Sequence, residues 1–259
     1  MTDASVHGGW QMKVRTQETT RAGRLVETGL VCVLAALVLA IGAVAFPGVL
    51  GPHLRATFGL ASAQTVADSG TGGYRFLALE PGGHGLPVTY DSCQPLHYVI
   101  NFDGAPARFA DGQFIHDAVE RISQASGLRF HYDGTSTLRR QTRSYDSGPI
   151  LFSFDAVADD PKLDGAAAIG GSAMVTRSGH RVYSTGEVTF ERDYFAKIAS
   201  WPDGEQEARA IALHEIGHVL GLDHVSATDE IMNPSAGHVL DLGPGDLAGL
   251  RILGSGPCF

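Results

Sequence analysis

The spacing of hydrophobic and polar residues in the C-terminal two thirds of the chain predicts several short strands. Along Leu96–Phe102 every second residue is apolar, as in a strand with one buried face. Four more segments have the composition and flanking turn residues of strands: Leu128–Tyr132, Ile150–Phe154, Ala173–Thr176 and Glu187–Glu191. The stretch 177–180, which contains Gly179, predicts a turn before the last of them.

A helical spacing of apolar residues follows the first strand, and helix signals return twice near the C-terminus. Asp111 can cap a helix that ends at Gly127 and whose apolar stripe is Ile115, Ala118, Val119, Ile122 and Ala125. Asp203, with Gln206 three residues later, predicts the start of a second helix through a capping box. A third helix is expected over Pro244–Leu253, with proline in its first turn.

The first fifty residues have a different pattern, which is typical of a membrane anchor. Leu30–Leu50 contains no charged residue, and about 20 apolar residues suffice to span a bilayer. The basic residues that precede it closely are Lys13, Arg15, Arg21 and Arg24. Only Arg55 follows it closely, so the positive-inside rule keeps the N-terminus in the cytoplasm. We therefore predict a cytoplasmic tail over residues 1–28, a single transmembrane signal anchor over 29–50 and an extracytoplasmic linker over 51–87.

A cleaved secretory signal peptide is the alternative interpretation of this N-terminal region. Cleavage would follow Ala61-Ser62-Ala63, although that site lies more than ten residues beyond the apolar run. Both interpretations export the C-terminal part, one on the cell membrane and the other as a secreted protein. Residues 88–259 are expected to form one domain of ordinary size.

The cysteine content agrees with an exported domain, which we expect to be a monomer. The formal net charge is −9 and no basic cluster interrupts it, which argues against nucleic acid as a partner. Cys93 and Cys258 bracket the expected domain, and in an oxidising compartment they are expected to form a disulfide bond. The alternatives are two unpaired thiols or a regulatory thiol switch. Cys32 lies inside the apolar run and is interpreted as an ordinary membrane residue.

Residues 214–224 carry the candidate chemistry: His-Glu-Ile-Gly-His-Val-Leu-Gly-Leu-Asp-His. Residues four apart share one face of a helix, so His214 and His218 can bind one zinc ion. Glu215 points to the same side, where a water activated by the metal would lie. Gly221 can adopt the left-handed conformation that ends a helix, which brings His224 back as a third ligand. Three imidazoles leave one zinc position open, as in catalytic sites.

Together with Met232 in Glu-Ile-Met-Asn-Pro, this run resembles the metzincin signature with its Met-turn. It is most similar to the matrixins, the branch related to matrix metalloproteinases, in their small bacterial form. The close match covers about residues 205–251. The resemblance implies an α+β, zincin-like catalytic domain with a twisted mixed sheet, an active-site helix and a C-terminal helix. It also implies that Met232 forms a hydrophobic floor under the ligands and that Asp246 braces the Met-turn by hydrogen bonds.

The implied activity is that of a zinc endopeptidase that hydrolyses proteins or peptides outside the membrane, with Glu215 as general base. A catalytically silent binding module on the same scaffold is the alternative, and the intact Glu215 argues against it. An intramembrane protease also uses His-Glu-x-x-His. The charged residues Glu205, Glu207 and Arg209 on the motif helix exclude that class, because such a helix cannot lie in a bilayer.

Other metal sites are less clearly indicated. Animal matrixins carry a histidine for a second, structural zinc where this chain has Thr189, so we expect one zinc only. Four carboxylates could bind calcium, as loops do in matrixins, or form a solvated acidic loop: Asp155, Asp159, Asp160 and Asp164. Five histidines have no partner at metal-ligand spacing and are expected to be surface or strand residues: His84, His97, His116, His131 and His180. His238 is interpreted as a solvated loop residue.

Overall fold

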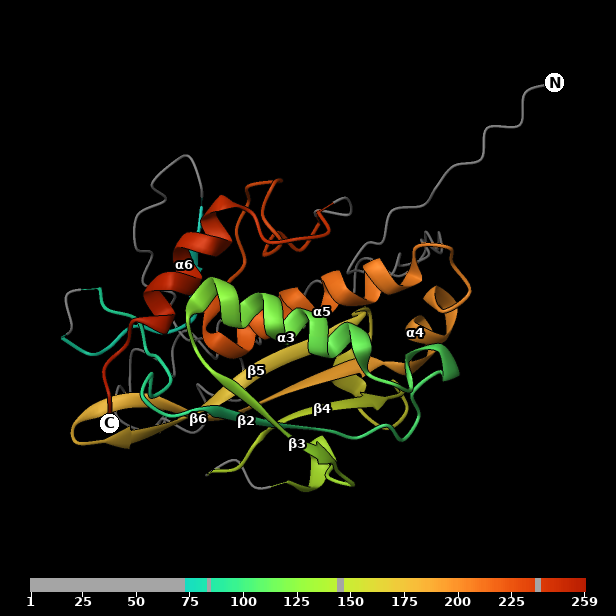
Figure 1. The fold of residues 1–259 in the computed structure, drawn as a ribbon, viewed down its shortest axis with the longest axis horizontal. Helices are drawn as coiled ribbons and strands as arrows, with labels where there is room; N and C mark the ends of the chain where they lie inside the picture. Colours follow the sequence, from blue (N-terminus) through green and yellow to red (C-terminus); the bar gives the residue numbers. More distant parts are fainter. Residues whose placement is uncertain (1–72, 83–84, 144–146, 236–238) are drawn as a thin grey trace, which may run out of the picture. The chain divides into compact units, whose positions relative to one another are not determined.

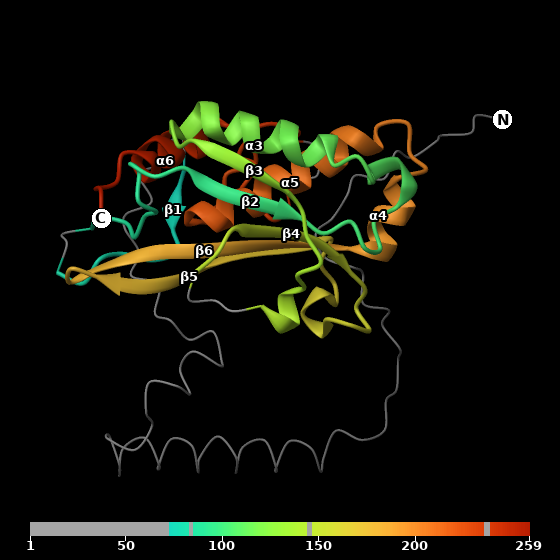
Figure 2. The same ribbon diagram turned by 60° about the horizontal axis from the view of Figure 1, so that its bottom comes forward.

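The computed structural model describes residues 73–82, 85–143, 147–235 and 239–259. Its centre is a five-stranded mixed sheet in the order β3-β2-β4-β6-β5 (Figures 1 and 2). The strands are β2 (Leu96–Ile100), β3 (Phe130–Thr135), β4 (Ile150–Asp155), β5 (Ala168–Arg177) and β6 (His180–Glu191). Four of them run parallel, and β5 pairs antiparallel with β6 at one edge. The predicted α+β fold with a mixed sheet is confirmed.

Parallel pairing of β2 and β3 requires a crossover, and α3 (Gln113–Ser126) supplies it. The helix begins after Gly112, which has a φ of 69°, rather than after Asp111 as predicted. The Asp111 carboxylate still accepts a hydrogen bond from the Gln113 N–H at 3.1 Å. Gly127 ends the helix in the left-handed conformation, with a φ of 78°, as its position predicted.

The active-site helix α5 (Gly204–Leu220) and α3 pack side by side on one face of the sheet (Figure 2). Between α3 and the sheet lies a cluster of buried aromatic rings: Phe109, Phe114, Phe152, Phe154, Phe190 and Phe195. The last helix, α6 (Pro244–Gly254), contacts both α3 and α5. The sheet and α3 therefore support α5 from one side.

Several elements differ from the sequence prediction. The strands β5 and β6 are much longer than predicted, because mutual pairing overrides the low strand propensity of glycines in β5. A short helix, α4 (Arg192–Ile198), was missed, and its cap is the Glu191 carboxylate. Asp203 makes no side-chain cap on α5, since its ψ of 13° is not the extended conformation that a capping side chain needs.

The last part of the expected linker is structured. Arg75–Phe76 forms β1, which pairs antiparallel with β7 (Leu222–Asp223), directly after the active-site helix. The folded unit therefore includes residues upstream of Val88, where the sequence analysis placed its start. A two-residue strand carries too little periodicity to be recognised from sequence.

Several predictions concern residues outside the described ranges: the cytoplasmic tail (1–28), the anchor (29–50) with Cys32, most of the linker (51–72), His84 and His238. Within the ranges that the structure describes, we find no helix that is both long and apolar enough to cross a bilayer.

Candidate active site

Three histidine side chains converge at the C-terminal end of α5. His214 and His218 lie one turn apart on the helix, and Gly221 ends it with a φ of 115°. The chain then reverses through β7 and brings back His224. A Cβ at position 221 would lie 3.0 Å from the Tyr183 ring, so glycine is required there for space as well as for conformation.

The geometry of the three imidazoles fits a tetrahedral zinc. Each pair of Nε2 atoms is 3.1 Å apart. Zinc–nitrogen bonds of 2.0–2.1 Å at tetrahedral angles require a separation of about 3.3 Å. These described residues therefore present three imidazole nitrogens in the arrangement of a catalytic zinc site.

The outer nitrogens of two of these rings determine where the protons lie. His214 Nδ1 donates to the Ile231 carbonyl oxygen at 2.7 Å, and His218 Nδ1 donates to the Leu222 carbonyl oxygen at 2.8 Å. Carbonyl oxygens only accept, so both Nε2 atoms hold lone pairs that face one another. Burial lowers the pKa of His214 well below its usual value and that of His218 to about 4, which keeps both rings neutral. Converging lone pairs of this kind need a cation between them.

Glu215, a residue of α5, faces the edge strand β5. Burial raises the pKa of its carboxyl group to about 8, and a hydrogen bond from the Gly170 backbone opposes that shift. A cation bound by the neighbouring histidines would favour the ionised form. A Cβ at Gly170 would lie 2.5 Å from the Glu215 carbonyl oxygen, so only glycine permits this approach of β5. Gly170 was not predicted as a site residue. The signal in the sequence was the glycine pair Gly170-Gly171, shortly before the predicted strand Ala173–Thr176.

Met232 packs against α5 at Gly217. It is 1% exposed, and a Cβ at Gly217 would lie 2.5 Å from its sulfur atom. The Asp246 carboxylate accepts hydrogen bonds from the N–H groups of Ile231 (2.6 Å) and Met232 (3.3 Å). These hydrogen bonds join Asp246 to the turn that contains Met232.

A second carboxylate, which the sequence analysis missed, supports the same turn. Glu230 is fully buried and accepts hydrogen bonds from the N–H groups of Gly245 (2.8 Å) and Asp246 (2.9 Å) at the start of α6. Acidic groups at a helix N-terminus are stabilised by its dipole. Burial and the neighbouring Glu230 raise the pKa of Asp246. A carboxylate of α6 thus accepts hydrogen bonds from the Met-turn, and a carboxylate of the Met-turn accepts hydrogen bonds from α6.

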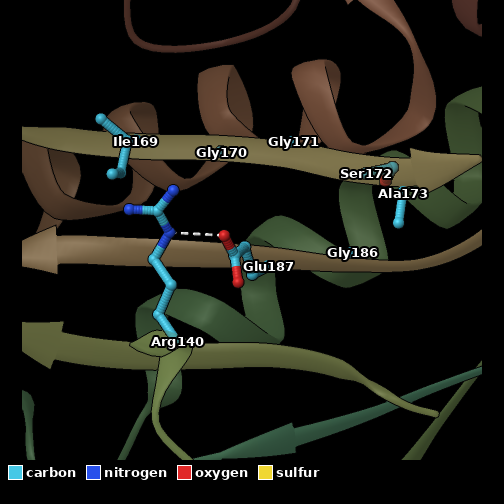
Figure 3. Close-up of a pocket in the computed structure, with 8 residues that line it drawn as sticks. All are labelled: Arg140, Ile169, Gly170, Gly171, Ser172, Ala173, Gly186 and Glu187. Atoms are coloured by element: carbon cyan, nitrogen blue, oxygen red, sulfur yellow. Dashed lines mark hydrogen bonds and ion pairs between the residues drawn. The ribbon is translucent and has the colours of Figure 1, made fainter. Parts of the chain in front are cut away.

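A cavity of about 230 Å³ lies beside β5 and β6, on the face of these strands that points away from the helices (Figure 3). Figure 3 shows the Arg140 side chain in front of these strands, directed to Glu187, with helices behind them. Arg140 also pairs with Asp160, and Arg139 pairs with Asp155 at 3.1 Å. Two of the four carboxylates considered for calcium are therefore neutralised by arginine, and no calcium site is shown.

The remaining predicted residues have clear positions. Thr189 is fully buried and lies 3.3 Å from the Ser153 hydroxyl group, in keeping with an ordinary strand residue. Cys93 and Cys258 form a disulfide bond with a Cα–Cα distance of 5.3 Å. His97 and His131 are exposed residues of β2 and β3, as the sequence predicted, and strand pairing brings both beside Asp133.

One comparison with known proteins, the match to a family model, agrees with this site. The family model described as matrixin, a peptidase family, matches residues 97–253, which is more than half of the chain. A comparison with curated proteins found no match. Among solved structures, the chain is similar to the crystal structure of archaemetzincin (amzA) from Methanopyrus kandleri at 14% identity and a TM-score of 0.39, over 61% of this chain and 94% of that one. The family match and the three-histidine cluster together show that the chain belongs to the matrixin family of zinc metallopeptidases.

Proposed function

We propose that this protein is an endopeptidase that hydrolyses proteins or peptides outside the cytoplasm, with Glu215 as its general base. The observation that carries the proposal is the position of Glu215. Glu215 directly follows the first histidine, and β5 packs against it at Gly170. Its carboxyl group is buried, a setting suited to proton transfer. A silent binding module would have no need of this carboxylate.

The roles of the side chains follow from their surroundings. His214, His218 and His224 would hold the zinc ion, which when bound supplies Lewis acidity that activates water and stabilises negative charge on a peptide carbonyl oxygen. Glu215 takes a proton from the attacking water. The same carboxyl group, now protonated, gives that proton to the leaving amine. Met232 and Asp246 position the ligands from below and do not react.

The proposed location is the outer side of a cell membrane, with residues 29–50 as anchor. The uncharged run and the basic residues ahead of it support this orientation. The disulfide bond between Cys93 and Cys258 fits an oxidising compartment outside the cytoplasm. Release after cleavage of a signal peptide is the alternative.

Replacing the proposed base tests the mechanism. Glu215→Ala is expected to keep its fold and its zinc but to lose hydrolysis of a generic protein substrate by at least about 100-fold, because general acid–base catalysis is removed. Zinc is counted by elemental analysis and the fold is checked by circular dichroism.

The matched control is Glu205→Ala, which removes an exposed carboxylate from the same helix. It should cleave the substrate like the parent. If Glu215→Ala retains parental activity with zinc bound, Glu215 is not the base. If the zinc-loaded parent cleaves no protein or peptide, the endopeptidase proposal itself is wrong.

A further inference from the structure

A second group of metal-ligand side chains lies on β2 and β3, at the sheet edge opposite β5. It consists of His97 on β2 and of His131 and Asp133 on β3. We propose that these three side chains bind a second divalent transition-metal ion of the zinc type. The site is separate from the catalytic histidines, since α5 packs against β5 at the other edge.

Strand pairing places the three side chains on one face. His97 and His131 are direct partners in the parallel register of β2 and β3. Asp133 follows His131 by two residues and therefore points to the same side of the strand. His97 is 36 residues from Asp133 in the sequence, which is why inspection of spacing did not find the cluster.

The donor atoms are already close together. His97 Nδ1 lies 2.9 and 3.0 Å from the two Asp133 oxygens, and His131 Nε2 lies 3.6 Å from the nearer one. All three donors lie within 4.8 Å of one another. Ligand atoms bound at about 2.1 Å to one ion lie roughly 3.0–3.4 Å apart in octahedral or tetrahedral geometry. Small rotations of exposed side chains are enough to reach that arrangement.

The chemistry of the donors selects the class of ion. Two imidazoles and one carboxylate suit zinc and its first-row neighbours, whereas magnesium and calcium prefer oxygen ligands alone. The side chains are 48% (His97), 64% (His131) and 35% (Asp133) exposed, so water can complete the coordination. An ion held by three exposed groups exchanges readily and binds more weakly than an ion in the buried catalytic site.

Contacts on the other face of β2 and β3 hold the two strands together and so fix the positions of the three donor residues. The rings of Tyr98 and Tyr132 lie 5.2 Å apart, and the Tyr98 hydroxyl group hydrogen-bonds His116 Nδ1 at 2.8 Å. These contacts tie β3 to β2 and α3 from the helix side. A metal ion on the outer face would link the edge strand β3 to β2 a second time, so its binding should stabilise the folded protein.

Zinc uptake by the purified protein tests the proposal. The protein is first loaded with zinc and freed of excess by dialysis, and then titrated with zinc under equilibrium dialysis. The parent should take up one further ion per chain. His131→Ala and Asp133→Asn should each lower the affinity for this ion at least about tenfold. Even the loss of a residue that only hydrogen-bonds to a metal ligand typically lowers metal affinity by about that factor. Added zinc should raise the melting temperature of the parent but not of these variants.

His180→Ala is the matched control, because it removes an exposed histidine from outside the cluster, and it should behave like the parent. His218→Ala separates the two sites: it should lose the catalytic zinc and keep the exchangeable ion. The proposal is overturned if the parent binds no further ion up to millimolar zinc. It is also overturned if folded Asp133→Asn and His131→Ala bind that ion as tightly as the parent.

Discussion

At the scale of single residues, burial sets the protonation of carboxyl groups on the active-site helix. Glu207 is 4% exposed, and its carboxyl group accepts a hydrogen bond from the Tyr194 hydroxyl group at 3.3 Å. Burial raises the pKa of Glu207 from 4.5 to about 7, and the Tyr194 hydrogen bond only partly offsets this. The ionised form of Glu207 is therefore disfavoured in the folded protein.

This pKa shift predicts a dependence of stability on pH. The folded state holds the Glu207 proton more tightly than the unfolded state, so this contribution to stability is full below about pH 4.5 and is lost as the pH rises through about 7. Glu207→Gln remains neutral throughout. Its free energy of unfolding relative to the parent should therefore increase between these pH values by on the order of 2 kcal/mol.

Urea unfolding of both proteins across pH 4–8 measures this difference. Glu205→Gln, an exposed substitution on the same helix, controls for the loss of a charge. Parallel stability curves for Glu207→Gln and the parent would show that Glu207 titrates alike in the folded and unfolded states.

At the scale of elements, the contact between β5 and α5 positions the carboxylate of Glu215, the proposed general base. The two elements touch where Gly170 meets the backbone of Glu215, so the strand supports the helix at this residue. Gly171, the next residue in β5, has no atom within 4 Å of the position where a Cβ would stand. Two adjacent glycines thus differ in whether the packing requires them.

Alanine at each position gives a matched pair. Gly170→Ala should lower the free energy of unfolding by about 1–3 kcal/mol, because the added methyl group must push strand and helix apart. Hydrolysis should also fall as Glu215 is displaced. Gly171→Ala should leave thermal stability unchanged or slightly raised. Equal stability of the two variants, measured by calorimetry, would contradict the described packing.

At the scale of the whole folded unit, the disulfide bond holds the C-terminus against the sheet. Cys93 precedes β2 and Cys258 follows α6, and the bond spans 165 residues. Around it, the Ser92 hydroxyl group donates to the Gly256 carbonyl oxygen at 2.6 Å. Since Asp246 at the start of α6 braces the Met-turn, the bond indirectly steadies the catalytic site.

Removal of this bond should lower stability without touching a zinc ligand. A loop of this length corresponds to about 5 kcal/mol in the chain-entropy model, and many native bonds contribute less. The variant with both cysteines changed to serine is expected to melt about 5–15 °C below the parent. Reductant should lower the parent to the same value and leave the variant unaffected. An unchanged melting temperature in the double variant would exclude a stabilising role.

The sequence by itself determined those features that depend on neighbours along the chain. The histidine motif lies within eleven residues, so helix geometry and Gly221 are sufficient to predict that its imidazoles converge. Gly127 likewise ends its helix through its own conformation. The existence of the five strands was predictable from alternation, composition and turn residues, whereas the length of β5 and β6 was not, because their mutual pairing extends them.

Only the tertiary structure decided contacts between distant segments. Gly170 lies against Glu215 because β5 closes the sheet edge beside α5, and Glu230 reaches the start of α6 because the Met-turn folds onto it. The pairing of His97 with His131 depends on the register of two parallel strands joined by a helix. Register is set by the burial of whole strand faces and by the crossover, which no local pattern of residues encodes.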